Sequence, residues 1–266
     1  AIIGLLYIQN LRISHNWGGD FAMYIMNAQN LVNGTPYAQT GYVYNPDTAY
    51  WGNPAYPPVF PLLLAPFVAI WGVNLMMLKL PVILCAVAAL FILNNKVLPK
   101  DLPALSRIIF TIGLGLYPYY FFLTEEILSD LSFLFISYLA LYRIDRQIQP
   151  DEGNLVRWGT WLVNGVLIYL AYGTRSVGIV LLAVVFFLSI FRLKRISLGA
   201  VATIITALVL IFAQSVLIPE ASGGYLTLLP NTLPELIMTL MYAVSYYADY
   251  FFALFQNDTL RYIHRV

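Results

Sequence analysis

Long apolar runs separated by short polar segments extend along most of the chain, and this pattern predicts helices that cross a membrane. A spanning helix needs about 20 mostly apolar residues, because the hydrocarbon offers its backbone no hydrogen-bond partner. Six runs meet this requirement and cover residues 80–98, 108–123, 131–142 with their flanks, 158–172, 177–191 and 198–218. The apolar opening, residues 1–8, predicts the end of one more such helix. The pattern therefore predicts about seven transmembrane helices.

The same pattern guides the interpretation of the two ends of the chain. The opening has no initiating Met and no basic residues before its apolar core, so we interpret the chain as a fragment, incomplete at both ends. Residues 233–255 are apolar but carry Glu235, Asp249 and many tyrosines, so they either span the membrane or lie along its interface. No repeat or linker divides the sequence, and we expect one all-α membrane domain over residues 1–266.

The first predicted outer loop, residues 12–58, contains a helix and an extended segment. Apolar residues fall on one stripe of residues 21–33 and predict a short amphipathic helix; they are Phe21, Tyr24, Ala28 and Leu31. Asp20 precedes this helix as a natural N-cap, and Gly34 follows it where a left-handed C-cap is common. The later prolines predict an extended chain that becomes helical only after Pro61.

Composition agrees with a membrane protein. Hydrophobic residues make up 60% of the chain, charged residues only 10%, and the mean hydropathy is +0.75. A soluble domain carries about a quarter charged residues and a disordered chain has fewer apolar ones, so both classes are excluded. The net charge of +1 gives no basic excess for nucleic acid, and the single cysteine, Cys85, lies in an apolar run typical of a buried position.

Basic residues predict the orientation, because Lys and Arg are enriched on the cytoplasmic side of membrane proteins. If residues 12–58 lie outside, alternating spans place nine of the 14 basic residues inside: Lys96, Lys100, Arg107, Arg143, Arg146, Arg157, Arg192, Lys194 and Arg195. Arg12, Lys79 and Arg175 then lie outside with most of the acidic residues. An ordered loop as long as residues 12–58 is often functional.

Acidic residues on the outer side are the first candidates for chemistry. Asp20 can cap the loop helix, act as a functional acid, or do both. Glu126 and Asp130 are four residues apart, so on a helix they would share one face at the outer edge of the membrane. Their proximity would raise the pKa of one of them unless a cation lies between. The alternative is that Asp130 or its neighbour caps a helix where two spans reverse.

Two basic residues on the outer side are candidates for contacts with anions. Arg175 joins two apolar spans, where it needs an anionic partner or open water. Its guanidinium can bind a phosphate through two hydrogen bonds, although exposure to solvent is the alternative. Lys79 lies at the outer start of a span, from which it can extend to the lipid headgroups.

Together these motifs resemble the first outer loop of the GT-C membrane glycosyltransferases. The shared features are an acidic residue after the first transmembrane helix, a Tyr-x-x-x-Ala-x-x-Leu-x-x-Gly pattern, Tyr-Pro-Pro and Pro-Leu-Leu-x-Ala, found here as Asp20, Tyr24, Ala28, Leu31 and Gly34, then Tyr56, Pro57 and Pro58, then Pro61, Leu62, Leu63 and Ala65. The branch that is most similar contains the protein O-mannosyltransferases and the lipid A aminoarabinose transferase. These enzymes take a sugar from a polyprenyl-phosphate donor at the outer membrane face.

The resemblance implies an inverting transfer of one sugar to a hydroxyl of a glycan, lipid or protein. The residues it implies are Asp20 as catalytic base, Glu126 and Asp130 for the acceptor or a cation, Arg175 and Lys79 for the donor phosphate, and Tyr24, Tyr56 and Asn53 for the sugar pocket. The resemblance implies no definite cofactor; a divalent cation, if one binds, would be held by Asp20 and Asp130. The expected location is a bacterial or archaeal plasma membrane rather than the endoplasmic reticulum, with the site facing outward.

The chain departs from the family at two places. Asp20 is followed by Phe21 where protein mannosyltransferases have Glu, and Tyr56 stands where the aminoarabinose transferase has Lys. The donor sugar is therefore left open. Two other classes also stay open, a transporter or lipid flippase, which would carry charges deep inside its spans, and a non-catalytic scaffold subunit that has kept the fold.

Overall fold

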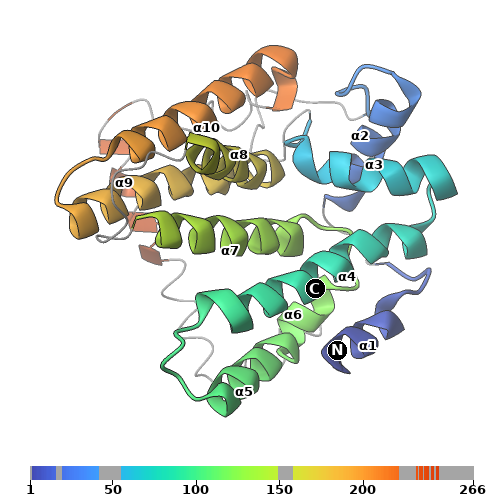
Figure 1. Cartoon of the computed structure of the whole chain (residues 1–266). Helices are drawn as coiled ribbons and strands as arrows, with labels where there is room; N and C mark the ends of the chain where they lie inside the picture. The colour runs from blue at the N-terminus through green and yellow to red at the C-terminus, as the bar shows by residue number, and fades with distance from the viewer. Residues whose placement is uncertain are drawn as a thin grey trace.

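The computed structural model describes residues 2–15, 20–41, 55–148 and 158–221, with residues 232, 234–235, 237–239, 241–242 and 244–245. All regular structure among them is helical, as predicted (Figure 1). The α-helices are α1 (Ile2–Tyr7), α2 (Phe21–Asn33), α3 (Val59–Trp71), α4 (Leu75–Ile92), α5 (Ala104–Gly115), α6 (Pro118–Leu123), α7 (Asp130–Gln147), α8 (Trp158–Thr174), α9 (Val180–Leu193) and α10 (Leu198–Leu217). Shorter helices extend them: the 3₁₀ helices η1 (Ile8–Asn10) and η4 (Ser176–Ile179) and the π-helix η3 (Leu93–Val97).

Three helical segments are long and apolar enough to cross a membrane, and they support the coarser part of the seven-helix prediction. They are Leu75–Val97, Ser176–Leu193 and Leu198–Leu217. Large apolar side chains on α9 and α10 are exposed, as expected for surfaces that contact lipid; they include Phe187, Phe191, Leu208 and Phe212. The other predicted spans within the described residues are helical but shorter or more charged, and their crossing of the membrane stays a prediction.

The predicted span over residues 108–123 is not one continuous helix. It is divided into α5 and α6, because the proline ring of Pro118 disfavours the helical conformation at the preceding Tyr117, which has φ −57° and ψ 128°. Pro118 then occupies the first turn of α6, where its missing N–H is not needed. The break places the end of α6, and the turn after it, beside the first outer loop.

The helix after the proline-rich segment begins earlier than predicted. We expected an extended chain until after Pro61, but α3 already begins at Val59. Pro61 lies in the first helical turn, where the backbone N–H groups have no partner inside the helix in any case. Only the residues up to Pro58 therefore precede the helix.

Helix α7 belongs to both apolar cores of the described residues. The first core surrounds Phe60 and Leu78 and includes residues of α1, α2, α3, α4 and α6. The second surrounds Ile144 and Ile168 and includes residues of α8, α9 and α10. In Figure 1, α7 runs between α4 and the group of α8, α9 and α10. Because α7 packs in both cores, its first residue, Asp130, is held in a defined place relative to both.

The predicted loop helix is confirmed as α2, with the predicted bounds. Gly34 ends it in the left-handed region at φ 67°, as expected of a C-cap glycine. Asp20 occupies the N-cap position, but its carboxylate accepts no hydrogen bond from the helix, so the capping interaction itself is absent. The buried amides of Asn27 and Asn30 both donate to the carbonyl oxygen of Tyr37, which ties the following loop to α2.

Gly178 in η4 marks a close approach that a larger residue would disrupt. A Cβ there would lie 2.5 Å from the backbone C of Ala171 and 2.5 Å from the backbone N of Tyr172. We expect Gly178→Ala to destabilise the fold by about 1–3 kcal/mol, because backbone atoms cannot yield as a flexible side chain can. The control is Gly113→Ala in α5, where a Cβ meets nothing within 4 Å. Thermal unfolding in detergent measures both, and equal melting temperatures would contradict the prediction.

Candidate active site

The phenol of Tyr24 lies at the centre of the candidate site. Tyr24 is on the buried face of α2, and its Oη shares a hydrogen bond with the Oγ of Ser129, 3.0 Å away. Its ring packs against Tyr56, with ring centroids 4.8 Å apart, and edge-on against Phe60 at 4.9 Å. Tyr24 thus joins three segments that are distant in sequence: the first outer loop, the start of α3 and the turn before α7.

Three of the predicted charged residues act on this phenol. Burial raises the pKa of Tyr24 most, while the hydrogen bond with Ser129 lowers it. Asp20 and Asp130 raise the same pKa further, and Arg175 lowers it. The phenol therefore remains protonated at neutral pH and can donate a hydrogen bond. The hydrogen bond between Tyr24 and Ser129 places α2, one turn after Asp20, next to the residue before Asp130, which pairs with Arg175.

Arg175 has an anionic partner, which is one of the two alternatives that its place between two spans left open. Its Nη1 lies 2.5 Å from Oδ1 of Asp130. Arg175 has an extended backbone between α8 and η4, and Asp130 is the first residue of α7. The side chains are 41% and 33% exposed, so an incoming anion can reach the guanidinium.

Asp20 is exposed and lies at the start of α2, one turn before Tyr24. Its carboxylate makes no capping hydrogen bond to α2 and is open to solvent. Among the residues that the structure describes, no group of three or more His, Cys, Asp or Glu side chains is arranged to hold a metal ion. The divalent cation expected at Asp20 and Asp130 stays a prediction.

Glu126 does not share a helix face with Asp130, so that interpretation is wrong. Residues 124–129 are not helical, and α7 begins only at Asp130. Glu126 is 3% exposed, and its Oε2 lies 3.3 Å from Nδ1 of His15, whereas Asp130 contacts Arg175. The two carboxylates belong to separate clusters. Their roles in binding an acceptor or a cation stay predictions.

Two further tyrosines extend the site beyond those singled out for the sugar pocket. The Oη of Tyr37 donates to the backbone carbonyl of Tyr56 at 2.7 Å. Burial raises the pKa of Tyr37 most, and the electrostatic effects of Tyr24 and Tyr169 raise it further. Sequence reasoning missed Tyr169 because it lies inside an apolar run; a hydroxyl near the outer end of that run was the available signal. Asn53 lies outside the described residues.

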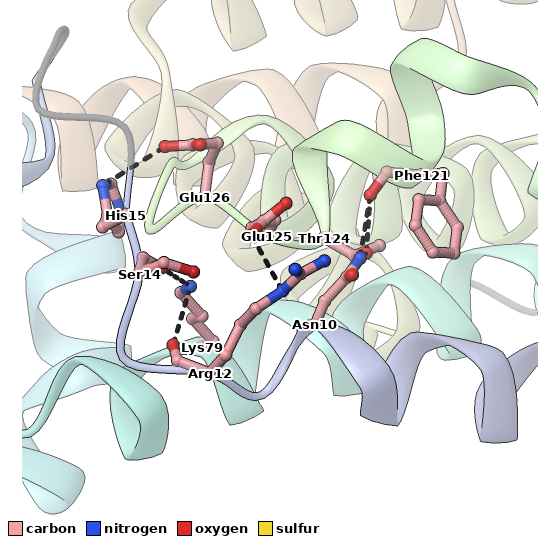
Figure 2. Close-up of polar contacts among 9 residues, drawn as sticks. All are labelled: Asn10, Arg12, Ser14, His15, Lys79, Phe121, Thr124, Glu125 and Glu126. Carbon is pink, nitrogen blue, oxygen red and sulfur yellow. Dashed lines mark hydrogen bonds and ion pairs between the residues drawn. The ribbon is translucent and has the colours of Figure 1, made fainter.

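Lys79 belongs to a second polar cluster, between the segment before α2 and the turn before α7 (Figure 2). It is fully buried, and its Nζ donates to the carbonyl oxygens of Arg12 at 3.0 Å and Ser14 at 2.5 Å. Arg12 in turn places its Nε 3.1 Å from Oε1 of Glu125. The expectation that Lys79 extends to the lipid headgroups is wrong, because backbone carbonyls of a neighbouring segment surround its ammonium. Its contact with a donor phosphate stays a prediction.

Comparisons with known proteins do not identify a family for the chain. No protein-family model, curated protein or solved structure matches the chain. The resemblance to GT-C enzymes therefore rests on the sequence motifs alone. What it implies for activity is a proposal.

The hydrogen bond between Tyr24 and Ser129 makes a testable contribution to the site. We expect Tyr24→Phe to destabilise the protein by about 1–3 kcal/mol, because the fully buried Ser129 hydroxyl loses this partner while ring packing is kept. Tyr119→Phe is the control, since Tyr119 is 59% exposed. Thermal unfolding of both variants in detergent checks this prediction. Equal melting temperatures for Tyr24→Phe and Tyr119→Phe would contradict it.

Proposed function

We propose that the chain is a membrane glycosyltransferase that moves one sugar from a polyprenyl-phosphate donor to an acceptor hydroxyl at the outer face of the membrane. The observation that carries this proposal is the hydrogen bond between Tyr24 and Ser129, which joins α2, one turn after Asp20, to the residue before Asp130, and Asp130 pairs with Arg175. An exposed carboxylate and a part-exposed guanidinium supply a proton acceptor and a phosphate-binding group in one place. Sugar transfer from a lipid phosphate requires both.

The proposed reaction is a direct displacement at the anomeric carbon of the sugar. The carboxylate of Asp20 takes the proton of the acceptor hydroxyl, and the acceptor oxygen forms the new bond to the anomeric carbon. The bond between that carbon and the phosphate oxygen breaks, and its electron pair leaves with the polyprenyl phosphate. Attack from the face opposite the phosphate inverts the configuration. The guanidinium of Arg175 stabilises the charge that develops on the leaving phosphate.

The position of Arg175 at a helix end supports its role at the phosphate. It directly precedes the candidate span Ser176–Leu193. A polyprenyl chain lies among the lipid tails with its phosphate at headgroup level, and cationic side chains at helix ends reach that level. The guanidinium and the donor phosphate would therefore meet at the same depth.

The ion pair with Asp130 gives Arg175 a partner that a phosphate can replace. A part-exposed pair contributes about 0–1 kcal/mol, because solvent screens it. A phosphate can form two parallel hydrogen bonds with a guanidinium, which makes it the stronger partner. Asp130 would then be released to bind a hydroxyl of the acceptor.

Binding of a short-chain polyprenyl phosphate tests the donor site without transfer. We expect the protein to bind it in preference to the matching polyprenol, and Arg175→Gln to lose this preference, in native mass spectrometry. The control is Arg192→Gln, which removes an arginine whose Nη2 lies 2.6 Å from Oδ1 of Asp145, near the other end of α9. Equal binding of the phosphate and the alcohol by the wild type would contradict the proposal.

A further inference from the structure

The buried imidazole of His15 faces Glu126 in the turn before α7 (Figure 2). Its Nε2 accepts a hydrogen bond from the backbone N–H of Ile127 at 3.0 Å, and its Nδ1 lies 3.3 Å from Oε2 of Glu126. The ring also packs on Phe21, with ring centroids 4.2 Å apart. One side chain therefore contacts both the first residue of α2 and the turn before α7.

These contacts fix where the imidazole carries its proton. A nitrogen that accepts a hydrogen bond from an N–H group carries no proton, so Nε2 of His15 is unprotonated. The neutral ring then holds its proton on Nδ1, which faces the carboxylate of Glu126. The contact is thus a hydrogen bond from a neutral ring to a buried carboxylate, and both ring nitrogens are occupied.

Lys79 binds the segment that carries His15 to α4, a helix that is long enough to span the membrane. Its ammonium binds the carbonyl oxygens of Arg12 and Ser14, and Ser14 directly precedes His15. Arg12 reaches Glu125 in the turn before α7. Lys79 is part of the candidate span Leu75–Val97. The segment before His15 is therefore bound both to α4 and to the turn before α7.

We infer that His15, as the Nδ1–H tautomer, is a positioning residue that sets the distance between Asp20 and the ion pair of Asp130 and Arg175. This inference rests on the proposed function. The ring contacts the residue that follows Asp20, and it binds the backbone three residues before Asp130. Because Phe21 is next to Asp20 in the chain and Ile127 is three residues from Asp130, a shift of the His15 ring would move both Asp20 and Asp130. In a reaction between positioned groups, a displacement of about 1 Å costs about 10²-fold in rate.

Two variants separate positioning from packing. His15→Phe keeps an aromatic ring against Phe21 but loses both hydrogen bonds, whereas His15→Gln keeps an acceptor for Ile127 and a donor for Glu126. We expect His15→Phe to lower kcat for sugar transfer about 10²-fold, with polyprenyl-phosphate binding unchanged, and His15→Gln to recover most of that rate. His15→Gln as slow as His15→Phe, or both as fast as the wild type, would overturn the inference.

Distances measured by pulsed electron paramagnetic resonance test the inference without sugar transfer. Spin labels at Ala22→Cys and Val177→Cys, both exposed positions, report how the start of α2 lies relative to η4, with Cys85 replaced by Ala. We expect one narrow distribution in the labelled parent and with His15→Gln, and a broader one with His15→Phe. The same distribution in all three overturns the inference. Absence of transfer by the wild type overturns the proposed function, and the distances then decide the positioning role.

Nitrogen NMR of labelled histidine reads the tautomer directly. The chain has two histidines, so the variant His264→Gln leaves the signals of His15 alone. We expect a protonated Nδ1 and an unprotonated Nε2 at neutral pH. A ring protonated on Nε2, alone or together with Nδ1, would overturn the inference whether or not sugar is transferred.

Discussion

Asparagine in place of Asp20 is expected to lower sugar transfer by about 10²–10⁴-fold, the range that a general base contributes. The amide is nearly the same size as the carboxylate but cannot take the proton of the acceptor hydroxyl. The fold should be unaffected, because the Asp20 side chain is exposed and makes no capping hydrogen bond to α2. Donor binding should also persist, since the phosphate is assigned to Arg175.

Transfer rates and melting temperatures of purified Asp20→Asn check this expectation. Asp101→Asn is the matched control, because Asp101 is an exposed aspartate in the loop before α5, away from the candidate site. It should transfer sugar at the wild-type rate. Near-normal transfer by folded Asp20→Asn would show that another group takes the proton.

Glutamine in place of Arg175 is expected to lower transfer by about 10²–10³-fold, the usual cost of removing one charge-stabilising donor from a transition state. The variant loses the positive charge opposite the leaving phosphate and leaves Asp130, now unpaired, beside it. The Asp130 carboxylate then repels the phosphate, which further disfavours an anionic donor. Arg175→Lys should keep part of the rate, because it restores the charge but not the planar pair of donors.

Single-turnover rates of Arg175→Gln and Arg175→Lys test whether the lysine variant is faster than the glutamine variant and slower than the wild type. Arg192→Gln again serves as the control, since it disrupts an arginine–aspartate pair of similar exposure at the opposite end of α9. The control should leave the rate unchanged. If Arg175→Gln transferred sugar at the same rate as Arg192→Gln, Arg175 would not be the group that stabilises the leaving phosphate.

Local signals in the sequence predicted the parts of the site that depend on one helix. The apolar stripe and Gly34 gave α2 its correct bounds, because amphipathic periodicity and a left-handed C-cap are local properties. An arginine between two apolar runs indicated an anionic partner or open water, because an unpaired charge at that depth is costly; the structure gives it Asp130 as partner and leaves it part-exposed. The contact between the rings of Tyr24 and Tyr56 joins two segments, and only the resemblance, which assigned both residues to the sugar pocket, suggested that they are neighbours.

Contacts between distant segments could not be derived from the pattern. Four-residue spacing suggested a shared helix face for Glu126 and Asp130, but the chain reverses between α6 and α7, and the imidazole of His15 binds Glu126 instead. Lys79 was expected at the membrane interface because the sequence shows only that it lies at the start of an apolar span. Its burial depends on the carbonyls of Arg12 and Ser14, which no local rule brings to it.

The release of label from radiolabelled polyprenyl-phosphate sugars tests the central claim most directly. Membranes that contain the protein would be incubated with a panel of such donors, and the wild type compared with Asp20→Asn. The account predicts that the wild type alone releases label from at least one donor, which would also identify the sugar. No release from any donor, by protein shown to be folded, would contradict the account and favour a transporter or a scaffold subunit.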